Sequence, residues 1–148
     1  MRARLFKSQF ASAVKTGLKR QTVRPIPKRM PKIGDDESWR EWTGLPYRSK
    51  QRELAQVELI SIEEITITKS QIIIGSKSIA EWELNTFART DGFVNWPYLR
   101  LWFTQQHGLP FTGILIKAKD LIRENPVPSV VKPSMRSARS SRPSVKFV

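Results

Sequence analysis

Apolar residues follow the spacing of a helix face in some parts of this chain of 148 residues and a β-branched, partly alternating pattern in others. Near the start, Phe10 and Val14 lie one helical turn apart, which predicts a helix over residues 7–16. Ser8 is a suitable residue to cap its first turn, and Gly17 is a suitable residue to end it. A short helix is therefore expected to lead into the segment after Gly17.

β-Branched residues mark the predicted strands. The longest such stretch covers residues 53–69 and continues at 72–74 after a turn at Lys69-Ser70, which predicts a hairpin. The segment 19–24 is expected on a strand or on the loop entering one, because Pro25 restricts the residue before it to extended backbone. Shorter strands are expected at residues 2–6, 38–42 and 111–118.

Helical spacing returns between residues 78 and 106. Ser78 and Glu81 stand three residues apart, as in a capping box, and predict the start of a helix. That helix is expected to end at Asp91-Gly92 and to bury Ile79, Trp82 and Phe87. A further amphipathic helix is predicted over residues 95–106.

The predicted order is strand, helix, several antiparallel strands, two helices and a last strand. This order favours an α+β fold whose sheet curls into a small β-barrel with flanking helices. Residues 1–123 are enough for one compact domain with its own core. Residues 124–148 are rich in Pro, Ser and Arg without a helical or strand period, so a disordered basic tail is expected there.

Positive charge is concentrated at the two ends of the chain, whose formal net charge is +13. Residues 1–32 hold ten Lys or Arg and no Asp or Glu, whereas residues 33–123 hold eleven basic and twelve acidic residues. A localised positive field attracts polyanions, of which phosphate backbones are the commonest in cells, so nucleic acid or a nucleotide is the expected partner. The charge can also serve solubility alone, and the sequence does not decide between the two.

Several kinds of chemistry are excluded by composition. The chain has no cysteine, so it has no disulfide and no thiolate metal site, and its single histidine, His107, provides no zinc cluster. No metal and no cofactor are expected. Because the N-terminus lacks the apolar run of a signal peptide and no stretch reaches the length of a membrane helix, we expect a cytoplasmic protein without a membrane partner.

The segment after the first predicted helix carries four residues in a recognisable order, Gly17, Lys19, Thr22 and Arg24. They match the Gly-x-Lys-x-x-Thr-x-Arg pattern near the start of ASCH domains, and the chain resembles this family of the PUA-like superfamily. It looks most like the phage and prophage branch. The likeness covers roughly residues 4–118 and includes the segments Lys32-Ile33-Gly34-Asp35, Trp39-Arg40-Glu41, 87–93 and 111–116.

The resemblance implies a PUA-like β-barrel with a cleft between barrel and helices. Members of this superfamily mostly bind RNA or modified nucleotides, so RNA or a nucleoside is the implied ligand. Some small ASCH proteins are amidohydrolases that remove the acetyl group from N4-acetylcytidine with a Lys, a Thr and an acidic residue. Lys19 and Thr22 match the first two positions, and Asp91 is one candidate for the third, where the family has a Glu.

Lys19, Thr22 and Asp91 are thus the candidate catalytic residues. Like charges at Arg20 and Arg24, combined with partial burial, would lower the pKa of Lys19 toward the range in which its amine accepts a proton. On a straight strand Lys19 and Thr22 point to opposite faces. Both line one pocket only if the chain turns or bulges between them.

Simpler interpretations stay open for each of these residues. The basic residues can be phosphate contacts, and the candidates for nucleic-acid binding are Lys19, Arg20, Arg24, Arg40, Arg48 and Lys50. Asp91 can be an ordinary helix-end residue, and Glu41 is an alternative pocket acid. Three tryptophans are candidate stacking surfaces, with core packing as the alternative: Trp39, Trp42 and Trp96.

The leading hypothesis is a binding module that holds RNA or a modified nucleotide in a basic cleft around residues 19–24. The alternative is an amidohydrolase acting on N4-acetylcytidine or a related acylated nucleoside. Convergence of the Lys19 amine, the Thr22 hydroxyl and a carboxylate in one pocket would favour chemistry, whereas the same groups spread over an open surface would favour binding. A role in binding another protein is a third possibility that the sequence leaves open.

Overall fold

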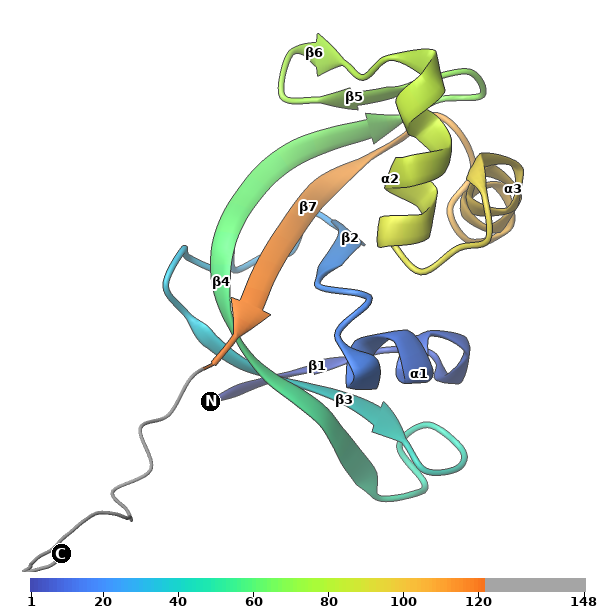
Figure 1. Ribbon diagram of the computed structural model, residues 1–148. Helices are drawn as coiled ribbons and strands as arrows, with labels where there is room; N and C mark the ends of the chain where they lie inside the picture. Colours follow the sequence, from blue (N-terminus) through green and yellow to red (C-terminus); the bar gives the residue numbers. More distant parts are fainter. Residues whose placement is uncertain (122–148) are drawn as a thin grey trace, which may run out of the picture.

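The computed structural model describes residues 1–121 and shows a mixed α+β fold. One sheet of seven strands is combined with three α-helices and a single turn of 3-10 helix (Figure 1). In chain order the elements are β1 (Arg2–Leu5), α1 (Ser8–Thr16), β2 (Gln21–Pro25), β3 (Asp36–Trp42), β4 (Gln51–Ile67), β5 (Ile72–Ile74), β6 (Lys77–Ser78), η1 (Glu81–Glu83), α2 (Leu84–Thr90), α3 (Trp96–Gln106) and β7 (Phe111–Asp120). The predicted tail, 124–148, lies outside the described residues.

The long strand β4 organises the sheet, and its strong curvature is plain in Figure 1. Its first half pairs with β3, its last three residues pair with β5, and β7 runs antiparallel along it from Val57 to Ile67. On the outer sides, β1 pairs in parallel with β3, and β2 pairs antiparallel with β7. The predicted hairpin of β4 and β5 is confirmed, and the backbone N–H of Thr68 bonds to the carbonyl of Gln71 across its turn.

The sheet is open, so the predicted small curled β-barrel is not confirmed. Within residues 1–121 no backbone ladder joins the outer strands β1 and β2. Instead, a side chain bridges the gap, because the guanidinium of Arg24 on β2 donates to the carbonyl oxygen of Leu5 on β1 at 2.9 Å. Side chains such as that of Arg24 occupy the space between these two strands. Residues 19–24, which carry the motif of the sequence analysis, lie beside it.

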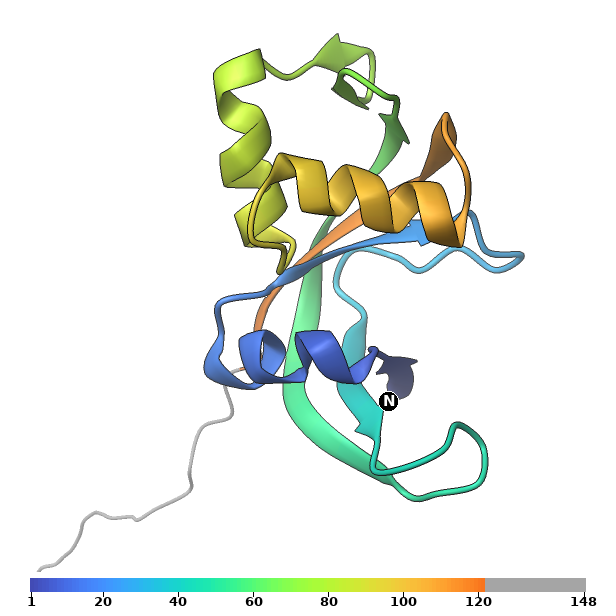
Figure 2. The same ribbon diagram turned by 90° about the vertical axis from the view of Figure 1, so that its right-hand side faces the viewer.

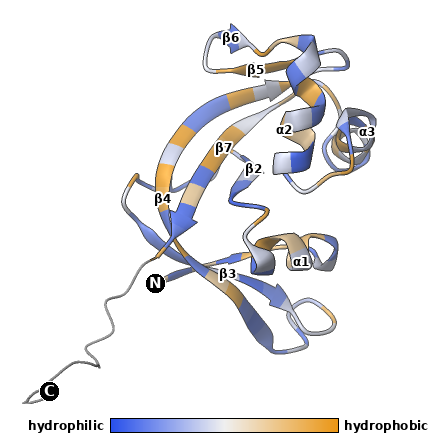
Figure 3. Ribbon diagram, in the orientation of Figure 1, coloured by the Kyte–Doolittle hydropathy of each residue, from blue (hydrophilic) through white to orange (hydrophobic). Residues whose placement is uncertain are grey.

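Two apolar clusters hold the helices against the sheet. Helices α2 and α3 cover one half of it, where Ile65, Phe103 and Leu115 are buried together. Helix α1 covers the other half, with Val14 and Trp39 fully buried. Figure 3 shows apolar positions along both β4 and β7, and Figure 2 shows α1 and α3 as separate layers on the same side of the sheet. A pocket lies where the two clusters meet, since Phe10 of one and Phe103 of the other both line it.

The helix predicted to begin at Ser78 begins later. Ser78 lies on β6 and its hydroxyl bonds to the side chain of Gln71 at 2.9 Å, while Glu83 accepts the backbone N–H of Ala80 at 3.2 Å. The cap is therefore formed two residues further along than the pattern indicated. As a consequence Trp82 is 79% exposed and does not join the core, contrary to the prediction.

The other predicted helices begin and end within one residue of the predicted positions, but Ser8 does not cap α1, because Lys7 is at the N-cap position and no side chain bonds to the first turn. Gly17 ends α1 with φ of +90°, a conformation that glycine adopts at little cost. The side chain of Asn95 caps α3 by accepting the backbone N–H of Tyr98. Among the described residues, no helix has the length and apolar character that crossing a membrane would require.

Candidate functional site

Lys19 and Thr22 line the same pocket because the chain turns just before β2. The backbone N–H of Lys19 still bonds to the carbonyl of Ala13 in α1, and the strand begins only at Gln21. Lys19 is therefore not part of the alternating strand that would have turned it away from Thr22. The turn itself lies at Gly17 and Leu18, before Lys19 and not between the two residues, so Lys19 and Thr22 share the pocket because Lys19 precedes the strand.

Asp91 is the carboxylate that meets Lys19. It follows α2, and its side chain oxygen Oδ1 lies 3.3 Å from the Lys19 amine, while its backbone carbonyl accepts a bond of 2.5 Å from the same amine. The side-chain amide of Gln21 donates to Oδ1 at 3.3 Å. Lys19 is 2% exposed and Asp91 is 3% exposed, so this is a buried ion pair.

Burial acts on the two partners in opposite directions. It lowers the pKa of Lys19, and the neighbouring Asp91 only partly opposes this effect. It raises the pKa of Asp91, against the influence of Lys19 and Gln21. Burial thus favours the neutral form of each partner, while the attraction between the two favours the charged pair.

Gly92 allows the end of α2 to approach Lys19. Its φ is +97°, and a Cβ atom at this position would lie 3.0 Å from a ring carbon of Phe10 and 3.1 Å from Cδ of Lys19. A larger residue would be strained in conformation and crowded against the site. The Asp91-Gly92 pair is thus both the predicted helix end and the element that places the carboxylate.

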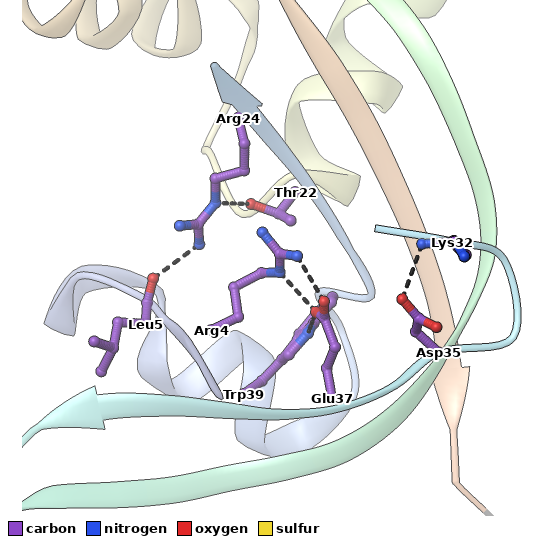
Figure 4. Close-up of polar contacts among 8 residues, drawn as sticks. All are labelled: Arg4, Leu5, Thr22, Arg24, Lys32, Asp35, Glu37 and Trp39. Carbon is purple, nitrogen blue, oxygen red and sulfur yellow. Dashed lines mark hydrogen bonds and ion pairs between the residues drawn. The ribbon is translucent and has the colours of Figure 1, made fainter. Parts of the chain in front are cut away.

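Arg24 and Thr22 form the second polar group in the pocket (Figure 4). Nε of Arg24 donates to Oγ1 of Thr22 at 2.9 Å, and the guanidinium lies over the ring of Phe6 with its carbon 4.7 Å from the centroid. Burial, followed by repulsion from Arg4, lowers the pKa of Arg24 to about 10. Within residues 1–121 no carboxylate forms a salt bridge with Arg24, so its charge is available to a ligand.

A buried ion pair that was not predicted from the sequence lies beside Arg24 and Thr22. Arg4 on β1 donates two bonds of 2.6 Å to Glu37 on β3, and the indole N–H of Trp39 donates a third of 3.1 Å (Figure 4). Burial by itself would raise the pKa of Glu37, but these bonds outweigh it and hold that pKa below 4.5. The signal in the sequence is that Glu37 shares the inward face of its strand with Trp39, two residues away.

The pocket has a volume of about 220 Å³, and its lining residues include several aromatic rings as well as Leu5, Lys7, Val23 and Pro25. Besides Lys19, Thr22, Arg24 and Asp91 it is lined by Phe6, Phe10, Phe93, Trp102, Phe103 and His107. The amine of Lys19 lies 5.0 Å from the ring centroid of Phe10. Polar groups at one side and aromatic rings around them are the arrangement expected for a small planar, polar ligand.

The other predicted cations do not line this pocket. Arg20 pairs with Asp120 at 2.7 Å and also donates to the Val14 carbonyl, while Arg40 bonds to Ser38 and lies 3.8 Å from Glu53. Arg48 and Lys50 lie on the loop between β3 and β4, and both are exposed. Only two of the six predicted nucleic-acid contacts, Lys19 and Arg24, thus face the pocket.

The remaining candidates divide clearly between core and surface. Trp39 is fully buried and Trp96 is 9% exposed, which agrees with core packing for both. Glu41 bonds to Arg52 at 3.2 Å and is not among the pocket residues, so Asp91 is the acid at the pocket. Trp42 lies outside the pocket, at the edge of a neighbouring groove.

Comparisons of the chain with models of protein families, with curated proteins and with solved structures find no match. In residues 1–121 no group of three or more His, Cys, Asp or Glu residues is arranged to hold a metal ion. What the fold and site define is an α+β domain with a pocket that combines a buried Lys–Asp pair, an Arg–Thr pair and aromatic walls.

Proposed function

We propose that the protein is an ASCH-type domain of the PUA-like superfamily whose pocket binds one modified nucleoside or one base of a nucleotide. The observation that supports this most strongly is the convergence of Lys19, Thr22 and Arg24 with Asp91 in a single aromatic pocket. Lys19, Thr22 and Arg24 are the motif residues that have side chains. Asp91 lies 67 positions after the last of them in the sequence.

A single base fits the pocket in both size and chemistry. Its volume of about 220 Å³ is below the roughly 300–1,000 Å³ that is common for drug-sized ligands. A base can pack between rings such as Phe6 and Trp102 and exchange hydrogen bonds with Thr22, Arg24 and Asp91 at its edge. Because a nucleoside carries no phosphate, its binding should depend only weakly on salt.

The binding experiment is calorimetric titration with a panel of cytidine, N4-acetylcytidine, uridine, adenosine and guanosine. We expect saturable binding of at least one member, with affinity at least tenfold weaker in Arg24→Met, because that variant loses the charged group at the pocket. Arg89→Met is the matched control, since Arg89 is exposed on α2 and is not a pocket residue. Absence of saturable binding for every member at millimolar concentration would reject the proposal.

A second candidate function is hydrolysis of an acetyl amide on such a nucleoside. The specific observation in its favour is that Arg24 donates to the hydroxyl oxygen of Thr22, which stabilises negative charge on that oxygen, in the same pocket as an amine of lowered pKa. Oγ1 of Thr22 would bond to the acetyl carbon while Lys19 takes its proton. The C–N bond then breaks while Asp91 protonates the leaving nitrogen. Water next adds to the acetyl carbon and gives a proton to Asp91, Lys19 returns its proton to Oγ1 of Thr22, and acetic acid leaves.

Variants at Thr22 test hydrolysis more cleanly than variants at Lys19. Replacing Lys19 would also leave Asp91 without its buried partner and so disturb the fold. With N4-acetylcytidine as substrate, Thr22→Val should abolish release of acetate, and Thr22→Ser, which keeps a hydroxyl, should retain measurable turnover. Equal turnover in Thr22→Val and wild type would exclude Thr22 as nucleophile. Binding without turnover in the wild type would leave the binding function alone.

A further inference from the structure

A second groove opens directly beside the pocket. It has a volume of about 520 Å³ and shares three lining residues with the pocket, Leu5, Phe6 and Lys7. The groove continues from this shared region to the loop between β3 and β4, where Trp42 and Tyr47 line it. In Figure 2 this loop projects from the same end of the molecule as the start of α1. The two hollows therefore meet at the three residues that they share.

The far end of the groove carries an exposed aromatic pair. The rings of Trp42 and Tyr47 have centroids 5.2 Å apart at an interplanar angle of 49°, and Tyr47 is 88% exposed. Tyr47 also adopts φ of +62°, which is uncommon for a residue with a large side chain. An aromatic ring held outward in this way contributes little to the core and offers a face to a ligand.

The loop that carries Tyr47 is held by its own hydrogen bonds. The backbone N–H of Thr43 bonds to the carbonyl of Lys50 at 2.9 Å, and the hydroxyl of Ser49 accepts from the Gly44 N–H and donates to the Leu45 carbonyl. The backbone that carries Tyr47 is thereby held beside the groove. A preorganised platform loses less conformational entropy when a ligand stacks on it.

Positive charge lies where the pocket and the groove join. Lys7 lines both hollows and is exposed, and the Arg24 guanidinium is bound to Leu5 and lies over Phe6, which also line both. The exposed Arg48 and Lys50 follow Tyr47 on the loop. A ligand that runs from the pocket to the aromatic pair thus passes between cations and is favoured if it carries a negative charge midway.

We propose that the groove binds the nucleotide next to the one in the pocket, so that the ligand is a single-stranded oligonucleotide and not a free nucleoside. One base occupies the pocket, the connecting phosphate lies beside Lys7 and Arg24, and the neighbouring base stacks on Tyr47. Base stacking on an aromatic side chain is worth about 1–3 kcal/mol, which is roughly a tenfold or larger gain in affinity. This inference rests on the proposed pocket function and adds that the ligand is a single-stranded oligonucleotide.

The test compares two probes, N4-acetylcytidine and the RNA trinucleotide in which uridine flanks N4-acetylcytidine on both sides, with the integrity of each probe checked after titration. We expect the trinucleotide to bind at least tenfold more tightly than the nucleoside. Tyr47→Ala should lower trinucleotide affinity about tenfold and leave nucleoside affinity within twofold, while Tyr47→Phe, which keeps the ring, should retain it. Tyr98→Ala, at an exposed tyrosine on α3 away from both hollows, is the control and should change neither.

The outcomes separate the two levels of the proposal. A nucleoside that binds while the trinucleotide binds no more tightly would overturn the groove and leave the pocket. A tighter trinucleotide whose affinity is unchanged by Tyr47→Ala and by Lys7→Gln would also overturn it, because the gain would then come from elsewhere. Failure of both probes to bind would overturn this inference, and the pocket function would be rejected as well if no member of the nucleoside panel bound.

Discussion

Replacing Lys19 by Met should destabilise the protein in a way that depends strongly on pH. The substitution keeps an unbranched side chain of similar length but leaves the carboxylate of Asp91 without its cation in a site that is 3% exposed. The buried carboxylate can avoid that cost by taking up a proton. Its ordinary pKa is 3.8, and each pH unit above this value costs about 1.4 kcal/mol for a group forced to stay protonated.

The cost is therefore limited to about 4 kcal/mol at pH 7 and to less than about 2 kcal/mol at pH 5. The free energy of unfolding, measured in urea by circular dichroism, should be about 2–4 kcal/mol lower in Lys19→Met than in wild type at pH 7. This deficit should shrink steadily as the pH is lowered toward 4. The sign follows because the folded variant binds more protons than the unfolded chain in this interval.

Two further variants make the reasoning refutable. Lys19→Met combined with Asp91→Asn removes the carboxylate as well and should recover much of the lost stability at pH 7. Lys15→Met, at an exposed position of α1, should stay within about 0.5 kcal/mol of wild type. A deficit in Lys19→Met that is the same at pH 5 and pH 7, or a double variant no more stable than the single one, would show that the charge of Asp91 is not the cause.

Other predictions concern the support of the site. Glu37→Gln should cost about 3 kcal/mol at pH 7 because Arg4 loses its buried carboxylate. The pKa of Glu37 in the folded protein lies below 4.5, so its contribution to the free energy of unfolding is present above that pH and is lost as the pH falls through the folded pKa. The stability of Glu37→Gln, measured in urea, should therefore fall less steeply in acid than that of the wild type. Gly113→Ala should cost about 1–3 kcal/mol in the same assay, because its Cβ would lie close against the carbonyl oxygen of Arg24, whereas Gly44→Ala should cost less. Equal losses in the two glycine variants would contradict the close packing of β2 on β7.

The parts of the fold that depend on local sequence were predictable. Gly17 ends α1, and the long β-branched stretch forms β4 with its hairpin to β5, because turn chemistry and hydrophobic spacing act within a few residues. The start of the helix after residue 78 was wrong by a few residues. There, the side chain of Glu83 reached the backbone at Ala80, while Ser78 was used in a strand.

Features that depend on distant contacts were harder to read. Closure of the sheet depends on whether β1 and β2 pair, and the side chain of Arg24 bonds to Leu5 where a ladder would have been needed. The ion pair of Arg4 and Glu37 joins residues 33 positions apart and had only the inward position of Glu37 as a signal. The meeting of Lys19 and Asp91 was a hypothesis drawn from family resemblance, since no local rule brings residues 72 positions apart together.

The most direct test of the central claim, that the pocket binds one modified nucleoside or base, is titration of the isotope-labelled protein with the nucleoside panel, followed by NMR. The account predicts that at least one nucleoside causes saturable shifts concentrated at the backbone signals of Thr22, Arg24 and Asp91 and at the indole signal of Trp102, all of which line the pocket. If no nucleoside in the panel shifts these signals up to millimolar concentration, or if saturable shifts lie only on residues away from the pocket, the claim is contradicted.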